Sequence, residues 1–186
     1  MNNPSGSGDT LLFMTVFGPS RLITLQLEQS TATCMPTAAI RYAHTNLIAN
    51  DWQKMQDFYC TVFGCVPVSS ERDHRGPQFT ALTGVTGGNA RGRHLRLPGH
   101  GDRGPTLEIF QYSANEPALP PAIKRPGFAH LAFEVPDVEA KRAEIQQWGG
   151  RDYGKLVTID IPGAGRLTLI YMCDPEGNIL ELQKWH

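Results

Sequence analysis

The fold of this chain can be worked out from Cys173-Asp174-Pro175-Glu176-Gly177-Asn178-Ile179-Leu180-Glu181-Leu182-Gln183-Lys184-Trp185. Asp174-Pro175 opens a tight turn, and Gly177-Asn178 closes it because these two residues tolerate a positive φ. A strand follows, on which the two leucines face one way while Glu181 faces the other. An acid between two leucines on the inner side of a hairpin needs a partner. That partner is either a metal or substrate, or an Arg or Lys side chain.

A second copy of this pattern lies earlier in the chain, which makes it an internal repeat. Each copy starts with a strand whose histidine stands seven residues before an aspartate that caps a helix, namely His44 with Asp51 and His130 with Asp137. Each copy ends on Leu-Glu-aliphatic, at Leu107-Glu108-Ile109 and at Leu180-Glu181-Leu182. Equivalent His and Glu residues in two halves indicate a shared function more strongly than four scattered residues would.

Periodicity predicts the elements between these landmarks. A strand is expected over 40–48, with Tyr42, His44 and Asn46 on one face, and a helix over 52–62 that ends at Gly64. Further elements of the first copy are strands over 65–68, 91–97 and 105–110 and a short helix over 77–85. In the second copy, periodicity predicts strands over 127–135, 157–161 and 167–172, a helix over 138–148 and the final hairpin.

The same signals divide the chain into parts. Residues 1–37 form an N-terminal extension that is expected to be partly disordered, in which Ile23 to Leu27 suit a short strand and Met35 is an alternative start. The first module covers 38–113, a proline-rich linker covers 114–126, and the second module covers 127–186.

Composition excludes several classes of function. With 186 residues and a net charge of −1, the chain has no basic footprint for nucleic acid or an anionic membrane. It has no apolar run near the ~18 residues of a membrane helix, and no signal peptide. Its four cysteines lack C-x-x-C spacing and are expected to be free thiols, so a cytoplasmic location is predicted.

Metal binding is the chemistry that the repeated residues favour. If the first and last strands of each module lie side by side, His44, Glu108, His130 and Glu181 can meet, and such a set suits Ni, Co, Fe, Mn or Zn. Four protein ligands leave two positions open for substrate, as in a catalytic site. Hydrogen-bonded core histidines are the alternative. The remaining histidines, which are His74, His94, His100 and His186, are predicted to lie at the surface, and the basic strand Arg91–Arg96 either holds an anionic substrate or is solvated.

Residues 38–186 resemble the vicinal oxygen chelate superfamily, which includes glyoxalase I, methylmalonyl-CoA epimerase, bleomycin-resistance proteins and extradiol dioxygenases. The resemblance rests on Tyr42-Ala43-His44-Thr45, Leu107-Glu108, Gly127-Phe128-Ala129-His130-Leu131-Ala132-Phe133 and the hairpin quoted above. It implies an α+β fold of two βαβββ modules whose curved mixed sheets surround a metal held by the four repeated residues. It also implies a homodimer and a small-molecule substrate, most closely as in the glyoxalase I and epimerase branches.

The reaction that this resemblance implies is an isomerisation, epimerisation or lyase step on a small α-oxygenated carbonyl compound, through a metal-stabilised enediolate. Glu181, or Glu108 in its place, would carry the proton, and Tyr42, Phe110 and Phe128 would wall the pocket. Ile48 stands where glyoxalase I has a basic residue for glutathione, so weak glutathione-dependent activity is expected. The alternatives are an Fe(II) ring-cleaving dioxygenase and a metal-free module that sequesters a drug or metabolite.

Overall fold

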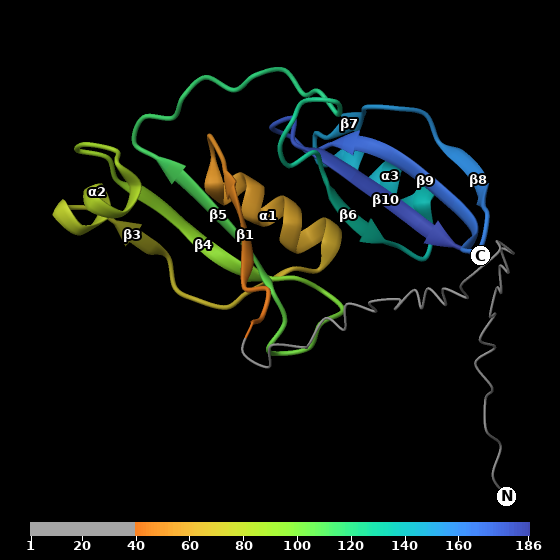
Figure 1. The fold of residues 1–186 in the computed structure, drawn as a ribbon, viewed down its shortest axis with the longest axis horizontal. Helices are drawn as coiled ribbons and strands as arrows, with labels where there is room; N and C mark the ends of the chain where they lie inside the picture. Colours follow the sequence, from red (N-terminus) through yellow and green to blue (C-terminus); the bar gives the residue numbers. More distant parts are fainter. Residues whose placement is uncertain (1–39) are drawn as a thin grey trace, which may run out of the picture. The chain divides into compact units, whose positions relative to one another are not determined.

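Two five-stranded mixed sheets, each with a helix on one face, make up residues 40–186, the part that the computed structural model describes (Figure 1). Arg41–His186 form one compact unit. The predicted α+β architecture is confirmed. The predictions for the extension over 1–37, including its short strand and the alternative start at Met35, lie outside the described residues.

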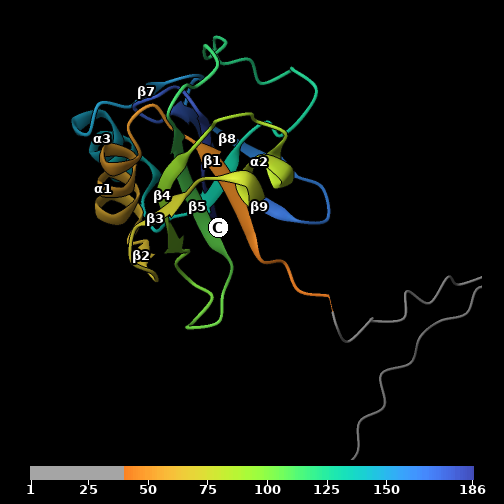
Figure 2. The same cartoon turned by 90° about the vertical axis from the view of Figure 1, so that its left-hand side faces the viewer.

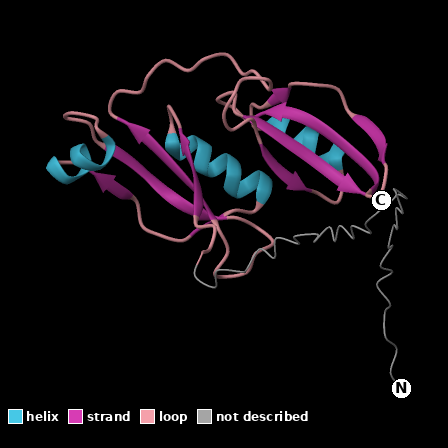
Figure 3. Cartoon of the chain, in the orientation of Figure 1, coloured by secondary structure: helices cyan, strands magenta, loops and turns pink. Residues whose placement is uncertain are grey.

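The two sheets follow one another along the chain. The first contains, in order, β1 (His44–Ile48), α1 (Trp52–Phe63), β2 (Val66–Pro67), β3 (Arg72–His74), α2 (Pro77–Thr83), β4 (Ala90–Arg96) and β5 (Thr106–Tyr112). The second contains β6 (Leu131–Glu134), α3 (Val138–Gln147), β7 (Arg151–Asp152), β8 (Val157–Ile161), β9 (Gly165–Cys173) and β10 (Ile179–Trp185). A long loop joins the sheets (Figure 3).

Strand order repeats from one sheet to the other. The first sheet runs β1-β5-β4-β2 with β3 on β4, and the second runs β6-β10-β9-β7 with β8 on β9. The first and last strands of each sheet are parallel neighbours, which is the side-by-side arrangement that the sequence analysis named as a condition for the His and Glu residues to meet. This pairing places the histidine at the start of each sheet beside the glutamate of its last strand.

Local sequence accounts for the two longer helices. Asp51 caps α1 by accepting a hydrogen bond from the Lys54 backbone N–H, and Gly64 ends it in the left-handed conformation at φ 69°. The buried face of α1 is an apolar stripe that contains Trp52, Met55, Phe58, Tyr59 and Val62. Asp137 caps α3 in the same way, through the backbone N–H of Ala140.

α1 and α3 lie side by side, and contacts between them join the two halves (Figure 2). The Phe63 ring, at the end of α1, stacks on Phe133 of β6 with 4.0 Å between ring centroids. The Lys141 ammonium on α3 donates to the Val62 carbonyl at 2.6 Å. The core is continuous across both helices, because residues of both sheets belong to one buried apolar cluster.

The turn before β10 holds the halves together through polar contacts. The Tyr59 hydroxyl donates at 3.0 Å to Asp174, whose side chain is fully buried. The Glu176 carboxylate accepts from the backbone N–H groups of Asn50 and Asp51, at 2.7 and 2.8 Å. A carboxylate at this position also favours the start of α1 electrostatically.

Several predicted boundaries were wrong. β1 begins at His44 rather than at Ile40, and β6 begins at Leu131 rather than at Gly127, so the residues before both histidines are loop. The apolar spacing in α2 does not bury that helix, since none of its residues is buried. The two short strands β3 and β7 were not predicted.

Cys60, Cys65 and Cys173, the cysteines among the described residues, carry free thiols as expected. Burial raises the pKa of Cys65 to about 12, which keeps that thiol protonated. Within residues 40–186, none of the helices combines the length and the apolar character that a membrane span requires.

Candidate metal and substrate site

A histidine and a glutamate meet on the first sheet. β1 and β5 are paired so that Asn46 lies opposite Glu108. His44, two residues before Asn46, projects from the same face of the sheet. The His44 Nε2 atom lies 3.5 Å from the Glu108 Oε2 atom. The Glu108 side chain is mostly buried, whereas His44 is about half exposed.

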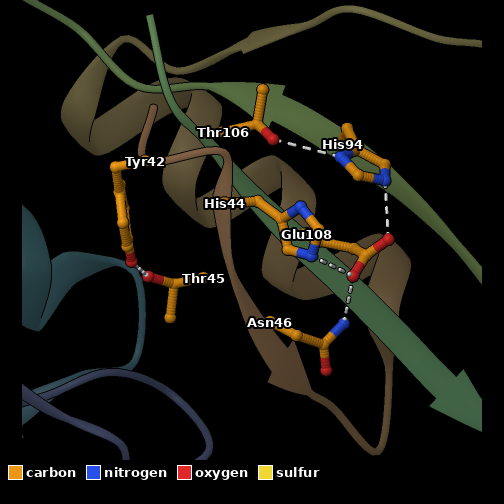
Figure 4. A network of polar contacts seen from close by, with 7 residues as sticks. All are labelled: Tyr42, His44, Thr45, Asn46, His94, Thr106 and Glu108. Atoms are coloured by element: carbon orange, nitrogen blue, oxygen red, sulfur yellow. Dashed lines mark hydrogen bonds and ion pairs between the residues drawn. The ribbon is translucent and has the colours of Figure 1, made fainter. Parts of the chain in front are cut away.

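Two further side chains contact the Glu108 carboxylate, one at each oxygen. Figure 4 shows Glu108 between His94 on one side and His44 and Asn46 on the other. The Asn46 amide donates to Oε2 at 2.8 Å, and the His94 Nε2 atom lies 2.6 Å from Oε1. The His94 Nε2 atom is buried and makes no well-aligned hydrogen bond, so its approach to Oε1 is a close contact between a ring nitrogen and a carboxylate oxygen. The other ring nitrogen of His94 lies 3.0 Å from the Thr106 hydroxyl.

His94 is a correction to the sequence analysis, which placed it at the surface. It is 8% exposed and faces Glu108 across β4 and β5. Burial lowers the pKa of His94, and the Glu108 charge only partly opposes this, so the ring is neutral at neutral pH. His74 was also expected at the surface, but it is half-buried and its ring stacks on Phe79.

The second sheet repeats the pair. His130 immediately precedes β6, and its Nε2 atom lies 3.3 Å from the Oε2 atom of Glu181 on β10. Tyr171 of β9 lies opposite Glu181, and its ring packs edge-on against His130. Burial, together with the neighbouring Glu181 carboxylate, raises the pKa of the Tyr171 hydroxyl, which therefore stays protonated as a donor.

Both histidines line one cavity of about 760 Å³. Tyr42 and Phe128, two of the three residues predicted to wall a pocket, also line it, and both are largely exposed. The third, Phe110, is buried against His74 and does not line the cavity. Arg125, which sequence analysis assigned only to the linker, is the single Lys or Arg side chain among the lining residues within 40–186. No sequence signal marked Arg125, because only the path of the loop brings it here.

The donors in each pair fit a divalent ion. Two metal bonds of about 2.0–2.2 Å at a right angle separate their ligand atoms by about 3 Å, close to the 3.5 and 3.3 Å found here. Imidazole and carboxylate ligands suit the predicted metals. Across residues 40–186, however, no group of three or more His, Cys, Asp and Glu side chains is arranged to hold one ion. Convergence of all four residues on a single metal stays a prediction.

Comparisons with known proteins give one family. The model of the Glyoxalase/Bleomycin resistance protein/Dioxygenase superfamily matches residues 41–182. A glyoxalase family protein from Bacillus cereus superposes with a TM-score of 0.65 at 13% identity, over 78% of this chain and 94% of that one. No curated protein matches the chain at a significant level.

Two further solved structures are similar over a comparable length of this chain. The glyoxalase family protein from Enterococcus faecalis has 26% identity and a TM-score of 0.50, over 80% of this chain and 99% of its own. A glyoxalase I mutant from Zea mays has 19% identity and a TM-score of 0.48, over 76% of this chain and 45% of its own.

Proposed function

This chain belongs to the Glyoxalase/Bleomycin resistance protein/Dioxygenase superfamily, and from that membership we propose that it is a metal-dependent isomerase, epimerase or lyase. The superfamily includes many enzymes, and its members bind small molecules, commonly use divalent metals and often dimerise. The substrate is a small carbonyl compound with an oxygen on the neighbouring carbon, and the working form is a homodimer.

The observation that supports this proposal is the presence of two equivalent His–Glu pairs whose histidines line one cavity. An ion pair that only stabilised the first sheet would not have to recur at the equivalent strand positions of the second sheet. A cavity lined by a histidine from each sheet, with a glutamate within 3.5 Å of each histidine, has the composition of a catalytic site rather than of a packed interior.

The metal is held by His44, Glu108, His130 and Glu181, and Ni, Co, Mn, Zn and Fe all suit this donor set. When bound, such an ion supplies Lewis-acid stabilisation of negative charge on two substrate oxygens. The histidines would contribute ring-nitrogen donors, and the glutamate carboxylates would partly neutralise the charge of the ion.

Glu181 acts as the base. Its carboxylate removes the proton from the carbon next to the carbonyl group and returns it to the neighbouring carbon or to the opposite face. Tyr171 lies opposite Glu181 on β9, and burial together with the Glu181 carboxylate keeps its hydroxyl protonated by raising its pKa. Tyr42 and Phe128 contact the substrate and exclude water, and Glu108 is the alternative base.

Charge at the cavity narrows the substrate class. Arg125 favours a substrate that carries a carboxylate or another anionic group. Ile48 lies on the same strand face as His44 and offers no positive charge to glutathione. We expect turnover of the methylglyoxal–glutathione hemithioacetal at less than a tenth of the rate of an authentic glyoxalase I, measured as thioester formation. Turnover within tenfold of that enzyme would contradict this substrate assignment.

The experiment that tests the function combines metal analysis with isotope exchange. Protein purified without chelator should contain about one divalent ion per chain, shared by its two His–Glu pairs. It should then exchange solvent deuterium into small α-hydroxy and α-keto acids, but not into their uncharged analogues. Oxygen consumption with catechols and Fe(II) would instead identify a dioxygenase. Ligand affinity that survives metal removal, with no exchange into any substrate, would identify a sequestering module.

A further inference from the structure

Glu108 and Glu181 occupy equivalent strand positions but have different neighbours. Glu108 of β5 is flanked by Asn46 on β1 and by His94 on β4. Strand pairing places Ala132 of β6 and Tyr171 of β9 at the corresponding positions beside Glu181. Paired residues on neighbouring strands project from the same face, so these flanking side chains determine which hydrogen bonds each glutamate makes.

Both carboxylate oxygens of Glu108 are engaged by the side chains beside it. Asn46 donates to Oε2 at 2.8 Å, and His94 contacts Oε1 at 2.6 Å. The Thr106 hydroxyl lies 3.0 Å from the second ring nitrogen of His94 and is able to donate a hydrogen bond to it. This arrangement assigns the His94 proton to Nε2, facing Glu108.

Glu181 has such a donor on one side only. Tyr171 supplies a hydroxyl, but the Ala132 side chain is a methyl group that cannot donate a hydrogen bond. The oxygen of Glu181 on the β6 side therefore has no strand neighbour equivalent to Asn46. Its partner there is His130, which lies in the loop before β6.

We propose that Asn46 and His94 are positioning residues that hold Glu108 in place as a fixed metal ligand, whereas Ala132 leaves Glu181 free to move as the proton carrier. This inference rests on the proposed function and deepens it, because it assigns different tasks to two residues of the same type. His94 does not line the cavity, Asn46 lies at its wall, and both side chains contact the Glu108 carboxylate directly. Both act through the orientation of Glu108.

Metal affinity is the first measurement, because it requires no substrate. Co²⁺ titrations followed by visible absorption should show binding about 10–100-fold weaker in Asn46→Ala and His94→Ala, as is usual when a partner of a metal ligand is lost. His94→Gln, which keeps a donor, should regain part of the affinity. His100→Ala is the matched control, because that exposed histidine lies in the loop between β4 and β5. Co²⁺ affinity within twofold of wild type in Asn46→Ala, a variant at an exposed position, would overturn the proposal.

The second test adds the missing donor. Ala132→Asn places beside Glu181 the amide that Asn46 gives Glu108, and the exposed position of Ala132 leaves room for it. Deuterium exchange into substrate should fall at least tenfold while Co²⁺ affinity is retained. Exchange at the wild-type rate with an intact metal site would overturn the division of tasks.

A third measurement separates this inference from the proposed function. In metal-free protein, the ¹⁵N shifts of the His94 ring should identify the Nε2–H tautomer. An Nδ1–H tautomer would overturn the inference even if the protein binds metal and turns over substrate. Failure of wild-type protein to bind Co²⁺ would instead remove the proposed function, and the tautomer would still decide whether His94 is oriented toward Glu108.

Discussion

At the scale of single residues, the chemistry proposed here depends on which groups surround each carboxylate. At Glu181 these groups are His130, whose Nε2 atom lies 3.3 Å from the carboxylate, and Tyr171, which lies opposite on β9. A carboxylate can serve both as a metal ligand and as a base, and these two roles can be separated by substitutions that keep the shape of the side chain.

Glu181→Gln should retain metal, because an amide oxygen still coordinates, yet lose substrate deuterium exchange by about 10²–10⁴-fold, because an amide does not accept the proton. His130→Ala should lose metal and exchange together. The measurements are metal content and exchange rate side by side. Glu134→Gln on the neighbouring strand is the matched control and should change neither. Exchange near the wild-type rate in metal-loaded Glu181→Gln would move the base to Glu108.

Gly92 gives a prediction about packing beside the first pair. A Cβ atom at this position would lie 1.9 Å from the Ile109 carbonyl oxygen and 2.8 Å from the Phe110 ring. Gly92→Ala should therefore lower the free energy of unfolding by about 1–3 kcal/mol, as overpacking does. Denaturant unfolding measures this cost. Gly154→Ala, whose Cβ would have no neighbour closer than 4.0 Å, should cost less than about 0.5 kcal/mol, and equal costs in the two variants would contradict the steric argument.

The sequence predicted the repeated His and Glu residues because they follow short-range spacings, but it missed His94. Alternation along Arg91–Leu97 identified a strand, and its three arginines suggested a solvated face. In the structure, His94 of that strand is paired with Glu108 of β5. Which residue faces Glu108 depends on the register of two strands, and no local pattern within either strand encodes that register.

At the scale of secondary structure, the helices were predictable because their signals are local. The caps, the apolar stripe of α1 and the glycine that ends it all lie within a few residues of one another. β3 and β7 were missed because strands of three and two residues exist only through pairing with β4 and β9. Propensity within so few residues carries little information.

The α1 cap can be tested directly. Asp51→Ala removes the acceptor for the Lys54 backbone N–H and should lower the free energy of unfolding by about 0.5–2 kcal/mol. Asp51→Asn should restore most of it, since an amide oxygen also caps a helix. Asp57→Ala, on an exposed position of the same helix, controls for the loss of a negative charge. An equal loss in the Asp57 variant, measured by urea unfolding, would show that charge rather than capping matters.

At the scale of the whole described unit, the two halves are joined by the helices α1 and α3 and by the turn before β10. The buried Asp174 carboxylate is the centre of that turn, accepting from Tyr59 and from three groups of Glu176 and Asn178. Burial raises the pKa of Asp174, although these hydrogen bonds oppose the shift.

This shift predicts how stability depends on pH. Because the folded pKa lies above the ordinary value of about 3.9, the folded state binds a proton more tightly than the unfolded state between the two pKa values. The stability of wild type relative to Asp174→Asn should therefore fall as pH rises through that window, and level off above it. Urea unfolding of both proteins across the range measures the difference. A difference that rises with pH would mean that the hydrogen bonds outweigh burial.

The Tyr59–Asp174 contact also affects how the protein is made. The two residues are 115 positions apart, so at about 5–20 residues per second a ribosome needs about 6–23 s between them. During that interval the remaining strands of the first sheet are synthesised, but α1 still lacks the acceptor for its buried tyrosine and the carboxylate at its first turn. A nascent chain paused before residue 138 also exposes the surface of α1 that α3 later contacts. We therefore expect chaperones and proteases to act on this chain mainly before residue 174 has been added.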